Sequence, residues 1–171
     1  MTISVRITPA ETVSMAKPLV LLVDDDEDVR LMTRVNLGFE GFDVREAVDG
    51  HAGLAAAREL HPDVIVLDVM MPGLDGLDVL RALREDSELA DIPVALLTAR
   101  AGATAENEGW TAGANAYLTK PFTSSALAST LRRLLAEDAD GRGAHREAAQ
   151  ARIDLASRLT QTSRTMYGTR P

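Results

Sequence analysis

Short apolar runs alternate with longer stretches of mixed polarity from residue 18 to about residue 140. Each run is four or five residues long and is predicted to be a strand, as is the more polar stretch 42–46. In the longer stretches the apolar residues recur at helical spacing, which predicts helices. The predicted strands span 19–23, 42–46, 64–67, 94–97 and 116–119. Such alternation predicts a parallel sheet with helices on both faces, the doubly wound α/β class of fold.

The predicted helices are indicated either by apolar residues at helical spacing or by capping residues at their starts. The first helix has several residues near helical spacing and is expected to end near Gly38 and Gly41. A weaker helix is expected at about 105–112. The spaced residues of the first helix are Val29, Met32, Thr33, Leu37 and Phe39. The predicted caps of later helices are Asp49, Asp75 or Gly76, and Thr123 or Ser124.

The segments on either side of the alternating region differ from it. Residues 1–17 are expected to form a leader, disordered or at most a loose strand, and residues 18–140 to form the domain. A polar stretch with two glycines, 137–143, is expected to end the last core helix. The remaining segment, 141–171, is expected to be a basic helical tail. Its predicted helix, 144–162, has a narrow apolar stripe made of Ala148, Ala151, Leu155 and Leu159.

Charge is distributed unevenly along the chain, whose net charge is −8. Residues from Gly141 onward include six arginines and two acids, which leaves about −12 for the first 140 residues. An acidic domain repels nucleic acid, so we expect no nucleic-acid partner. There is no cysteine, no signal peptide and no apolar run near the roughly 20 residues that span a bilayer. These features predict a cytoplasmic protein without a membrane partner.

Polar side chains follow four of the predicted strands, at the point where each strand ends. The carboxyl ends of parallel strands share one edge of a sheet, so these side chains are expected to meet in one pocket. Crowded carboxylates repel one another, and Mg²⁺, which prefers oxygen ligands, resolves that repulsion. A lysine and a hydroxyl can then hold a phosphoryl group. The residues concerned are Asp24-Asp25-Asp26, Asp68, Thr98 and Lys120.

Four motifs in register make the chain resemble the receiver domain of two-component response regulators, of the single-domain type found in chemotaxis regulators. The resemblance covers about 18–137 and implies a flavodoxin-like sheet with strand order 2-1-3-4-5. It also leaves an extra C-terminal helix beyond the domain. The motifs are Val20-Leu21-Leu22-Val23-Asp24-Asp25, Val66-Leu67-Asp68-Val69-Met70-Met71-Pro72-Gly73-Leu74-Asp75-Gly76, Leu97-Thr98-Ala99, and Gly113-Ala114-Asn115-Ala116-Tyr117-Leu118-Thr119-Lys120-Pro121-Phe122.

The resemblance also implies a role for each site residue. Asp68 would accept the phosphoryl group, and Lys120 would pair first with Asp68 and then with that group. Thr98 would donate to a phosphoryl oxygen, and Tyr117 would swing inward behind it as a switch. The Lys120–Pro121 peptide bond would be cis. The implied Mg²⁺ ligands are Asp25 and Asp68 directly, the backbone carbonyl of Met70, and Asp24 largely through water.

The resulting hypothesis is a stand-alone receiver that takes a phosphoryl group from a histidine kinase or a histidine phosphotransfer protein and then changes its binding to an unknown downstream protein. It would catalyse only its own phosphorylation and dephosphorylation and would not be a metabolic enzyme. Two alternatives stay open: an interaction module that works without phosphorylation, and the receiver part of a longer response regulator. For the tail 141–171, a solvated helix, a homodimer contact and docking on another protein all stay open.

Overall fold

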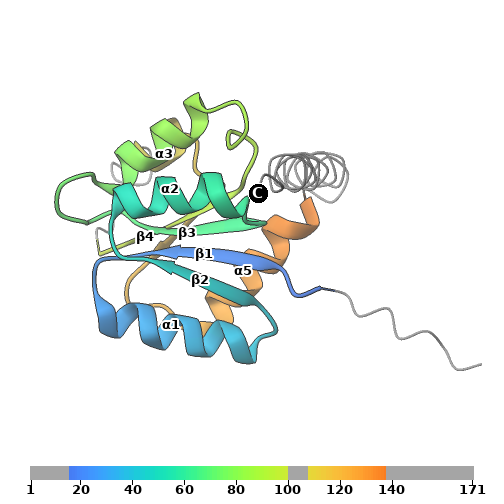
Figure 1. The fold of residues 1–171 in the computed structure, drawn as a ribbon. Helices are drawn as coiled ribbons and strands as arrows, with labels where there is room; N and C mark the ends of the chain where they lie inside the picture. Colours follow the sequence, from blue (N-terminus) through green and yellow to red (C-terminus); the bar gives the residue numbers. More distant parts are fainter. Residues whose placement is uncertain (1–15, 100–107, 138–171) are drawn as a thin grey trace, which may run out of the picture.

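The computed structural model describes residues 16–99 and 108–137 of the protein. Five parallel strands form one sheet in the order β2-β1-β3-β4-β5, as predicted. Helices α1 and α5 cover one face of this sheet, and α2 and α3 cover the other (Figure 1). The strands are β1 Leu19–Val23, β2 Asp43–Ala47, β3 Val64–Asp68, β4 Val94–Thr98 and β5 Ala116–Thr119.

The helices begin where the sequence places a capping side chain. Asp49 accepts a hydrogen bond from the Ala52 amide, and Asp75 accepts one from the Asp78 amide. The Thr123 hydroxyl caps the last helix in the same way. These contacts satisfy amides that the first turn of a helix leaves without a partner. The helices are α1 Glu27–Phe39, α2 Gly50–Leu60, α3 Gly76–Glu85 and α5 Ser124–Glu137.

Several predictions fall partly or wholly outside the described residues. Residues 108–111 are helical, but the rest of the helix expected at 105–112 is not described. Of the expected leader, only Ala16 and Lys17 are described, and the whole tail 141–171 lies outside the described residues. In the parts of the chain that are described, every helix is too short or too polar to cross a membrane.

The core consists of aliphatic side chains on both faces of the sheet. Strands β3 and β4 are buried along their whole length. On one face, strand residues such as Leu21 and Leu67 pack with side chains of α2 and α3. On the other face, residues such as Leu22 and Val66 pack with α1 and α5. Central parallel strands are buried on both sides because crossover helices lie on both faces, which explains their continuous apolar runs.

The start predicted for β2 was wrong, and the structure shows which faces the residues of α1 occupy. Strand β2 starts at Asp43 rather than at residue 42, because its pairing with β1 begins at Leu19 and Asp43. The residues near helical spacing in α1 do not share one face. Leu37 is buried, whereas Phe39 is 87% exposed. Residues two apart are about 200° apart around a helix, so these two side chains point in nearly opposite directions.

The Arg84 side chain, at the last turn of α3, ties together the segments that lead into β4 and β5. Its guanidinium donates to the backbone carbonyls of Ala90 at 3.0 Å and Ile92 at 2.9 Å. It also donates to the carbonyl of Gly113 and to the side-chain oxygen of Asn115, both at 2.9 Å. One arginine therefore supplies hydrogen-bond donors to four acceptors on two separate segments.

Arg84→Ala is expected to lower the free energy of unfolding by about 2–4 kcal/mol, because half-buried acceptors lose a charged donor. Urea unfolding followed by circular dichroism measures this. Arg81→Ala is the matched control, since the Arg81 side chain is 55% exposed and pairs with Asp78 across one helical turn. That change should cost less than about 0.5 kcal/mol. Equal losses in the two variants would contradict the prediction.

Candidate functional site

Three aspartates meet at the carboxyl edge of the sheet. Asp24 follows β1 directly and Asp68 is the last residue of β3, and these two strands are neighbours. Oxygen atoms of Asp24, Asp25 and Asp68 all lie within 4.8 Å of one another. Asp24 and Asp68 are buried, while Asp25 is exposed and forms the open side of the cluster. The sequence prediction that these strand ends converge is confirmed.

Lys120 reaches this cluster from the end of β5, at the far side of the sheet. Its ammonium nitrogen lies 2.9 Å from Asp24 Oδ2 and 3.2 Å from Asp68 Oδ2. Burial lowers the pKa of Lys120, but the hydrogen bond to Asp24 and the negative charges of Asp68 and Asp24 outweigh burial and raise it above its ordinary value. The amine therefore stays charged. The resemblance implied pairing with Asp68 alone; the structure adds Asp24 as the nearer partner.

The Asp24 carboxylate has a partner on each oxygen. Oδ1 accepts from the Asp26 amide at 2.9 Å, and Oδ2 accepts from Lys120. The Asp26 side chain in turn caps α1 by accepting from the amides of Asp28 and Val29. Asp26 is therefore part of the helix start and not of the cluster, which confirms its predicted place toward the first helix.

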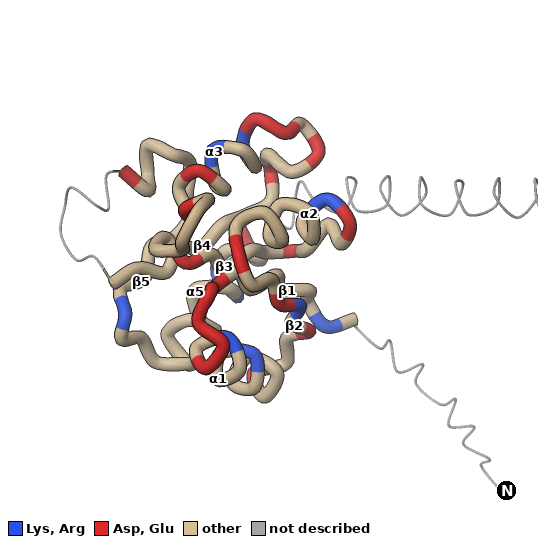
Figure 2. The backbone as a smooth tube through the Cα atoms, turned by 60° about the vertical axis from the view of Figure 1, so that its left-hand side comes forward, with Lys and Arg blue, Asp and Glu red and all other residues tan. Residues whose placement is uncertain are grey.

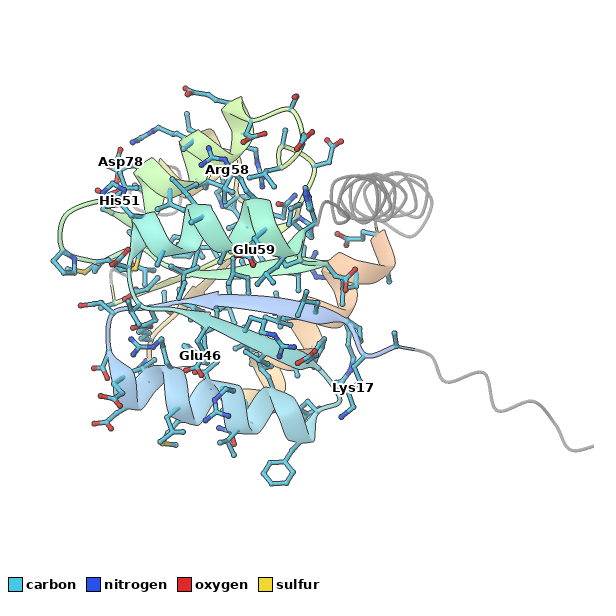
Figure 3. The ribbon with its side chains drawn as sticks, viewed as in Figure 1. Lys17, Glu46, His51, Arg58, Glu59 and Asp78 are labelled. Atoms are coloured by element: carbon cyan, nitrogen blue, oxygen red, sulfur yellow. The ribbon has the colours of Figure 1, made fainter. Side chains whose placement is uncertain are left out.

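Arg30 is a neighbour of the site that sequence reasoning missed. Its guanidinium donates to the backbone carbonyl of Asp24 at 2.7 Å, and its side chain is 11% exposed. Glu46 belongs to β2, and its side chain lies toward α1 in Figure 3. Its carboxylate oxygens lie 3.9 Å from Arg30 Nε and 2.8 Å from Arg34 Nε. Nothing in the spacing of Arg30 distinguishes it from an ordinary surface arginine of α1, so only the folded contact identifies it.

Asp68 is held in surroundings that disfavour its charge. Burial raises the pKa of this carboxyl, and the charge of Asp24 raises it further. The Lys120 charge and the Met70 amide, which donates to Asp68 Oδ1 at 3.3 Å, act in the opposite direction without cancelling the increase. The Asp68 carboxyl is thus contacted from two sides, by Lys120 and by the Met70 amide, while its pKa stays above the ordinary value.

Helix α3 packs directly against the backbone of Asp68. A Cβ atom at Gly76 would stand 2.1 Å from the Asp68 carbonyl oxygen and 2.8 Å from the Val69 Cα. Both neighbours are backbone atoms that cannot move aside. Glycine is therefore required at the start of α3, and this close approach fixes the strand end that carries Asp68.

The remaining predicted residues lie around the cluster. Thr98 ends β4 and is buried, next to Leu97, which pairs with Asp68 in the sheet. Tyr117 is a partly buried residue of β5, and its ring lies against Gly109 of the helical turn at 108–111. Met70, whose carbonyl is an implied ligand, has an exposed side chain. The roles of these three residues stay predictions.

The donor set fits a hard divalent cation. Three carboxylates supply oxygen atoms only, which suits Mg²⁺, and the exposed Asp25 leaves a side open for water ligands. The Lys120–Pro121 peptide bond beside the site is cis, as the resemblance implied.

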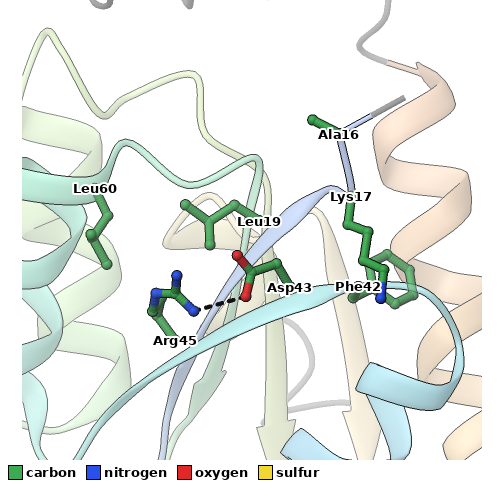
Figure 4. Close-up of a pocket in the computed structure, with 7 residues that line it drawn as sticks. All are labelled: Ala16, Lys17, Leu19, Phe42, Asp43, Arg45 and Leu60. Carbon is green, nitrogen blue, oxygen red and sulfur yellow. Dashed lines mark hydrogen bonds and ion pairs between the residues drawn. The ribbon is translucent and has the colours of Figure 1, made fainter. Parts of the chain in front are cut away.

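One hollow in the described part of the chain lies elsewhere, at the opposite edge of the sheet (Figure 4). It has a volume of about 500 Å³ and none of the predicted site residues line it. Asp43 and Arg45 in its wall pair with each other at 2.8 Å, and Lys17 also lines it. The carboxyl edge of the sheet therefore remains the candidate site.

The structure thus combines a doubly wound sheet with an acidic cluster and a lysine at its carboxyl edge. The family model of the response regulator receiver domain matches residues 20–132, and the chain belongs to that family.

Curated relatives share the domain but are longer. The chain is 43% identical over 118 residues to the DNA-binding dual master transcriptional regulator RpaA of Synechocystis, covering 69% of this chain and 49% of that protein. It is 43% identical over 136 residues to the response regulator MprA of Mycolicibacterium vanbaalenii, covering 80% of this chain and 58% of that protein. The chain thus spans about half the length of the curated relatives it matches.

Solved structures of similar sequence cover the domain almost completely. The chemotaxis protein CheY4 of Vibrio cholerae has a TM-score of 0.67 and 36% identity, over 70% of this chain and 99% of that chain. The receiver domain of the Francisella response regulator 1452 has a TM-score of 0.67 and 34% identity, over 71% and 98%.

Asp68→Asn is expected to increase stability at neutral pH. Because the pKa of Asp68 is raised, the folded protein holds its proton more tightly than the unfolded chain, so stability falls as pH rises above the ordinary carboxyl value of 3.8. Asparagine removes this dependence, and Lys120 keeps Asp24 as a partner.

Urea unfolding across acidic and neutral pH tests this expectation. The gain from Asp68→Asn should be present at neutral pH and should disappear below the ordinary carboxyl pKa. Asp78→Asn, an exposed change on α3, serves as the control and should alter stability by less than about 0.5 kcal/mol at any pH. A variant that is no more stable than the parent at neutral pH would contradict the argument.

Proposed function

We propose that this protein is a phosphorylation-dependent signalling receiver that accepts a phosphoryl group on Asp68. The observation that carries the proposal is the shared Lys120 ammonium, which lies within 3.2 Å of Asp24 and Asp68 carboxylate oxygens in a member of the receiver family. The donor would be a phosphohistidine of a histidine kinase or of a histidine phosphotransfer protein.

The proposed reaction is a phosphoryl transfer between two side chains. An Asp68 oxygen attacks phosphorus, an acyl phosphate bond forms, and the phosphorus–nitrogen bond of the donor histidine breaks. The electron pair stays on the imidazole nitrogen, which takes up a proton. Hydrolysis of the acyl phosphate restores Asp68. The protein would thus catalyse only its own modification and its reversal.

The residues around Asp68 have complementary tasks in this proposal. Lys120 would follow the phosphoryl oxygens, and the Thr98 hydroxyl would donate to one of them. Asp24, Asp25, Asp68 and the Met70 carbonyl would hold Mg²⁺. When bound, Mg²⁺ would neutralise charge on the carboxylates and on the transferring group.

The output of the proposed receiver is a change in partner binding. Movement of Thr98 would be sensed by Tyr117, whose ring lies between β5 and the helical turn at 108–111. The surface formed by that turn, β5 and α5 would then bind a downstream protein differently. A cytoplasmic location and a homodimer through the tail 141–171 belong to the same proposal and stay predictions.

A second candidate is the receiver part of a longer transcriptional regulator. It is favoured by the relatives, because the chain spans about half of their length and one of them is described as DNA-binding. A module that works without phosphorylation is less well supported, since Asp24, Asp25, Asp68 and Lys120 are all present and in contact distance.

Incubation with acetyl phosphate and Mg²⁺ is expected to add one phosphoryl group, seen by intact mass and removed by hydroxylamine, as an acyl phosphate requires. Asp68→Asn should abolish the mass increase, because the nucleophilic oxygen is gone. Asp75→Asn, which changes a helix cap of similar chemistry outside the cluster, should leave labelling in place. Full labelling of the Asp68 variant would refute the assignment.

Mg²⁺ affinity should depend on Asp25. Asp25→Ala is expected to weaken binding by about tenfold or more, because an oxygen ligand of the cluster is lost. Calorimetric titration with MgCl₂ measures the affinity without any phosphodonor. Asp28→Ala is the matched control: Asp28 is an exposed acid three residues away that is not part of the cluster. Equal affinities in the two variants would place the cation elsewhere.

A further inference from the structure

The outer face of α1 is apolar although it points to solvent. Seven large hydrophobic side chains are exposed in the described part of the chain, and four of them belong to this helix. They are Leu31, Met32, Val35 and Phe39, exposed by 47%, 65%, 42% and 87%. An exposed apolar patch of this kind marks a surface that binds something. We call these four residues the α1 outer face.

The shape of the α1 outer face suits a second helix. Leu31, Val35 and Phe39 follow one another at intervals of four residues, which forms a stripe about 12 Å long. The stripe is acidic at its N-terminal end, where Glu27 and Asp28 are exposed. Figure 2 shows the acidic stretch as a red segment that runs from the end of β1 into α1.

Both arginines of α1 already interact with acceptors in the domain. Arg34, the exposed arginine of α1, pairs with Glu46 at 2.8 Å. Arg30 is nearly buried and contacts the Asp24 carbonyl. The α1 outer face therefore fits an occupant that is apolar along one side and basic beside it.

We propose that the segment 144–162 of the same chain covers the α1 outer face. The sequence of this segment predicts a helix with a narrow apolar stripe, and the residues from Gly141 onward carry six arginines and two acids. A helix of this length is marginal in water and needs a surface on which to fold. This inference goes beyond the proposed function and does not depend on it.

The end of α5 brings the chain close enough for this contact. Helices α1 and α5 lie on the same face of the sheet (Figure 1). Arg132 of α5 donates to the Glu40 carbonyl at 2.9 Å and to its carboxylate at 2.7 Å, and Glu40 caps the C-terminal end of α1. Glu137, the last residue of α5, lies about 8 Å further along that helix. The six residues 138–143 can span up to about 20 Å, which is more than the roughly 8 Å by which α5 continues past its contact with the end of α1.

From that end, the segment would run antiparallel to α1. Its small residues Ala148 and Ala151 would then lie opposite the large Phe39 side chain, and Leu155 and Leu159 opposite Val35 and Leu31. The stripe from Ala148 to Leu159 is about 16 Å long, comparable with the α1 outer face. Arg158 would lie near the acidic end of α1.

A tether of this length favours docking within one chain over docking between two copies. A short flexible link holds the segment at an effective concentration in the millimolar range. A second copy would reach the same face only at comparable protein concentrations. The homodimer expected from the sequence is therefore the competing outcome.

Cysteine cross-linking of the full chain tests the proposal, since the protein has no cysteine of its own. The test pair is Val35→Cys with Leu155→Cys. The control pair is Glu59→Cys with Leu155→Cys, because Glu59 is exposed on α2, on the other side of the sheet (Figure 3). Under mild oxidation in dilute protein, the test pair is expected to form a disulfide within one chain about tenfold faster than the control.

Two other results would overturn the proposal. Equal rates in the two pairs would show that the segment has no preference for α1, and cross-linked dimers would show that it docks on a second copy. A separate measurement uses single-cysteine Val35→Cys and its reaction with a thiol reagent. Adding Leu155→Asp and Leu159→Asp should speed this reaction several-fold by uncovering α1, with the circular dichroism of the domain unchanged. An unchanged rate counts against the proposal.

Discussion

The site depends on the two ion pairs that the Lys120 ammonium forms with Asp24 and Asp68. Three carboxylates gathered within 4.8 Å repel one another, and a single lysine within 3.2 Å of two of them offsets part of that repulsion. The lysine is in turn kept charged by the same carboxylates. The cluster and its cation are therefore mutually dependent, and the raised pKa of Asp68 shows that the offset is incomplete.

The fold places these groups because strands that are distant in the sequence are neighbours in the sheet. Asp68 is the last residue of β3, and Asp24 and Lys120 directly follow β1 and β5. The parallel order brings all three to one edge. Local contacts then refine each position. Arg30 holds the Asp24 carbonyl from outside the cluster, and Gly76 lets α3 approach the backbone of Asp68. The same elements that form the core thus orient the chemistry.

Helix α1 connects the site to a separate surface. Its N-terminus is capped by Asp26, the residue after two members of the acidic cluster, and its solvent side carries the α1 outer face. A helix that is apolar toward both the core and the solvent is unusual for an isolated domain.

The sequence by itself determined the element order, the helix cap at Asp49, and the aspartates and lysine that meet at the sheet edge. It narrowed two further caps to Asp75 or Gly76 and to Thr123 or Ser124, and the family motifs implied the strand order. These features follow from local spacing and from residues whose type is tied to one conformation or one chemistry. Only the tertiary structure decided that Lys120 lies nearer to Asp24 than to Asp68, that Arg30 belongs to the site, and that Phe39 faces solvent while Leu37 faces the core. Such facts depend on distances between elements and on which side of a helix meets the sheet, and no local pattern encodes them.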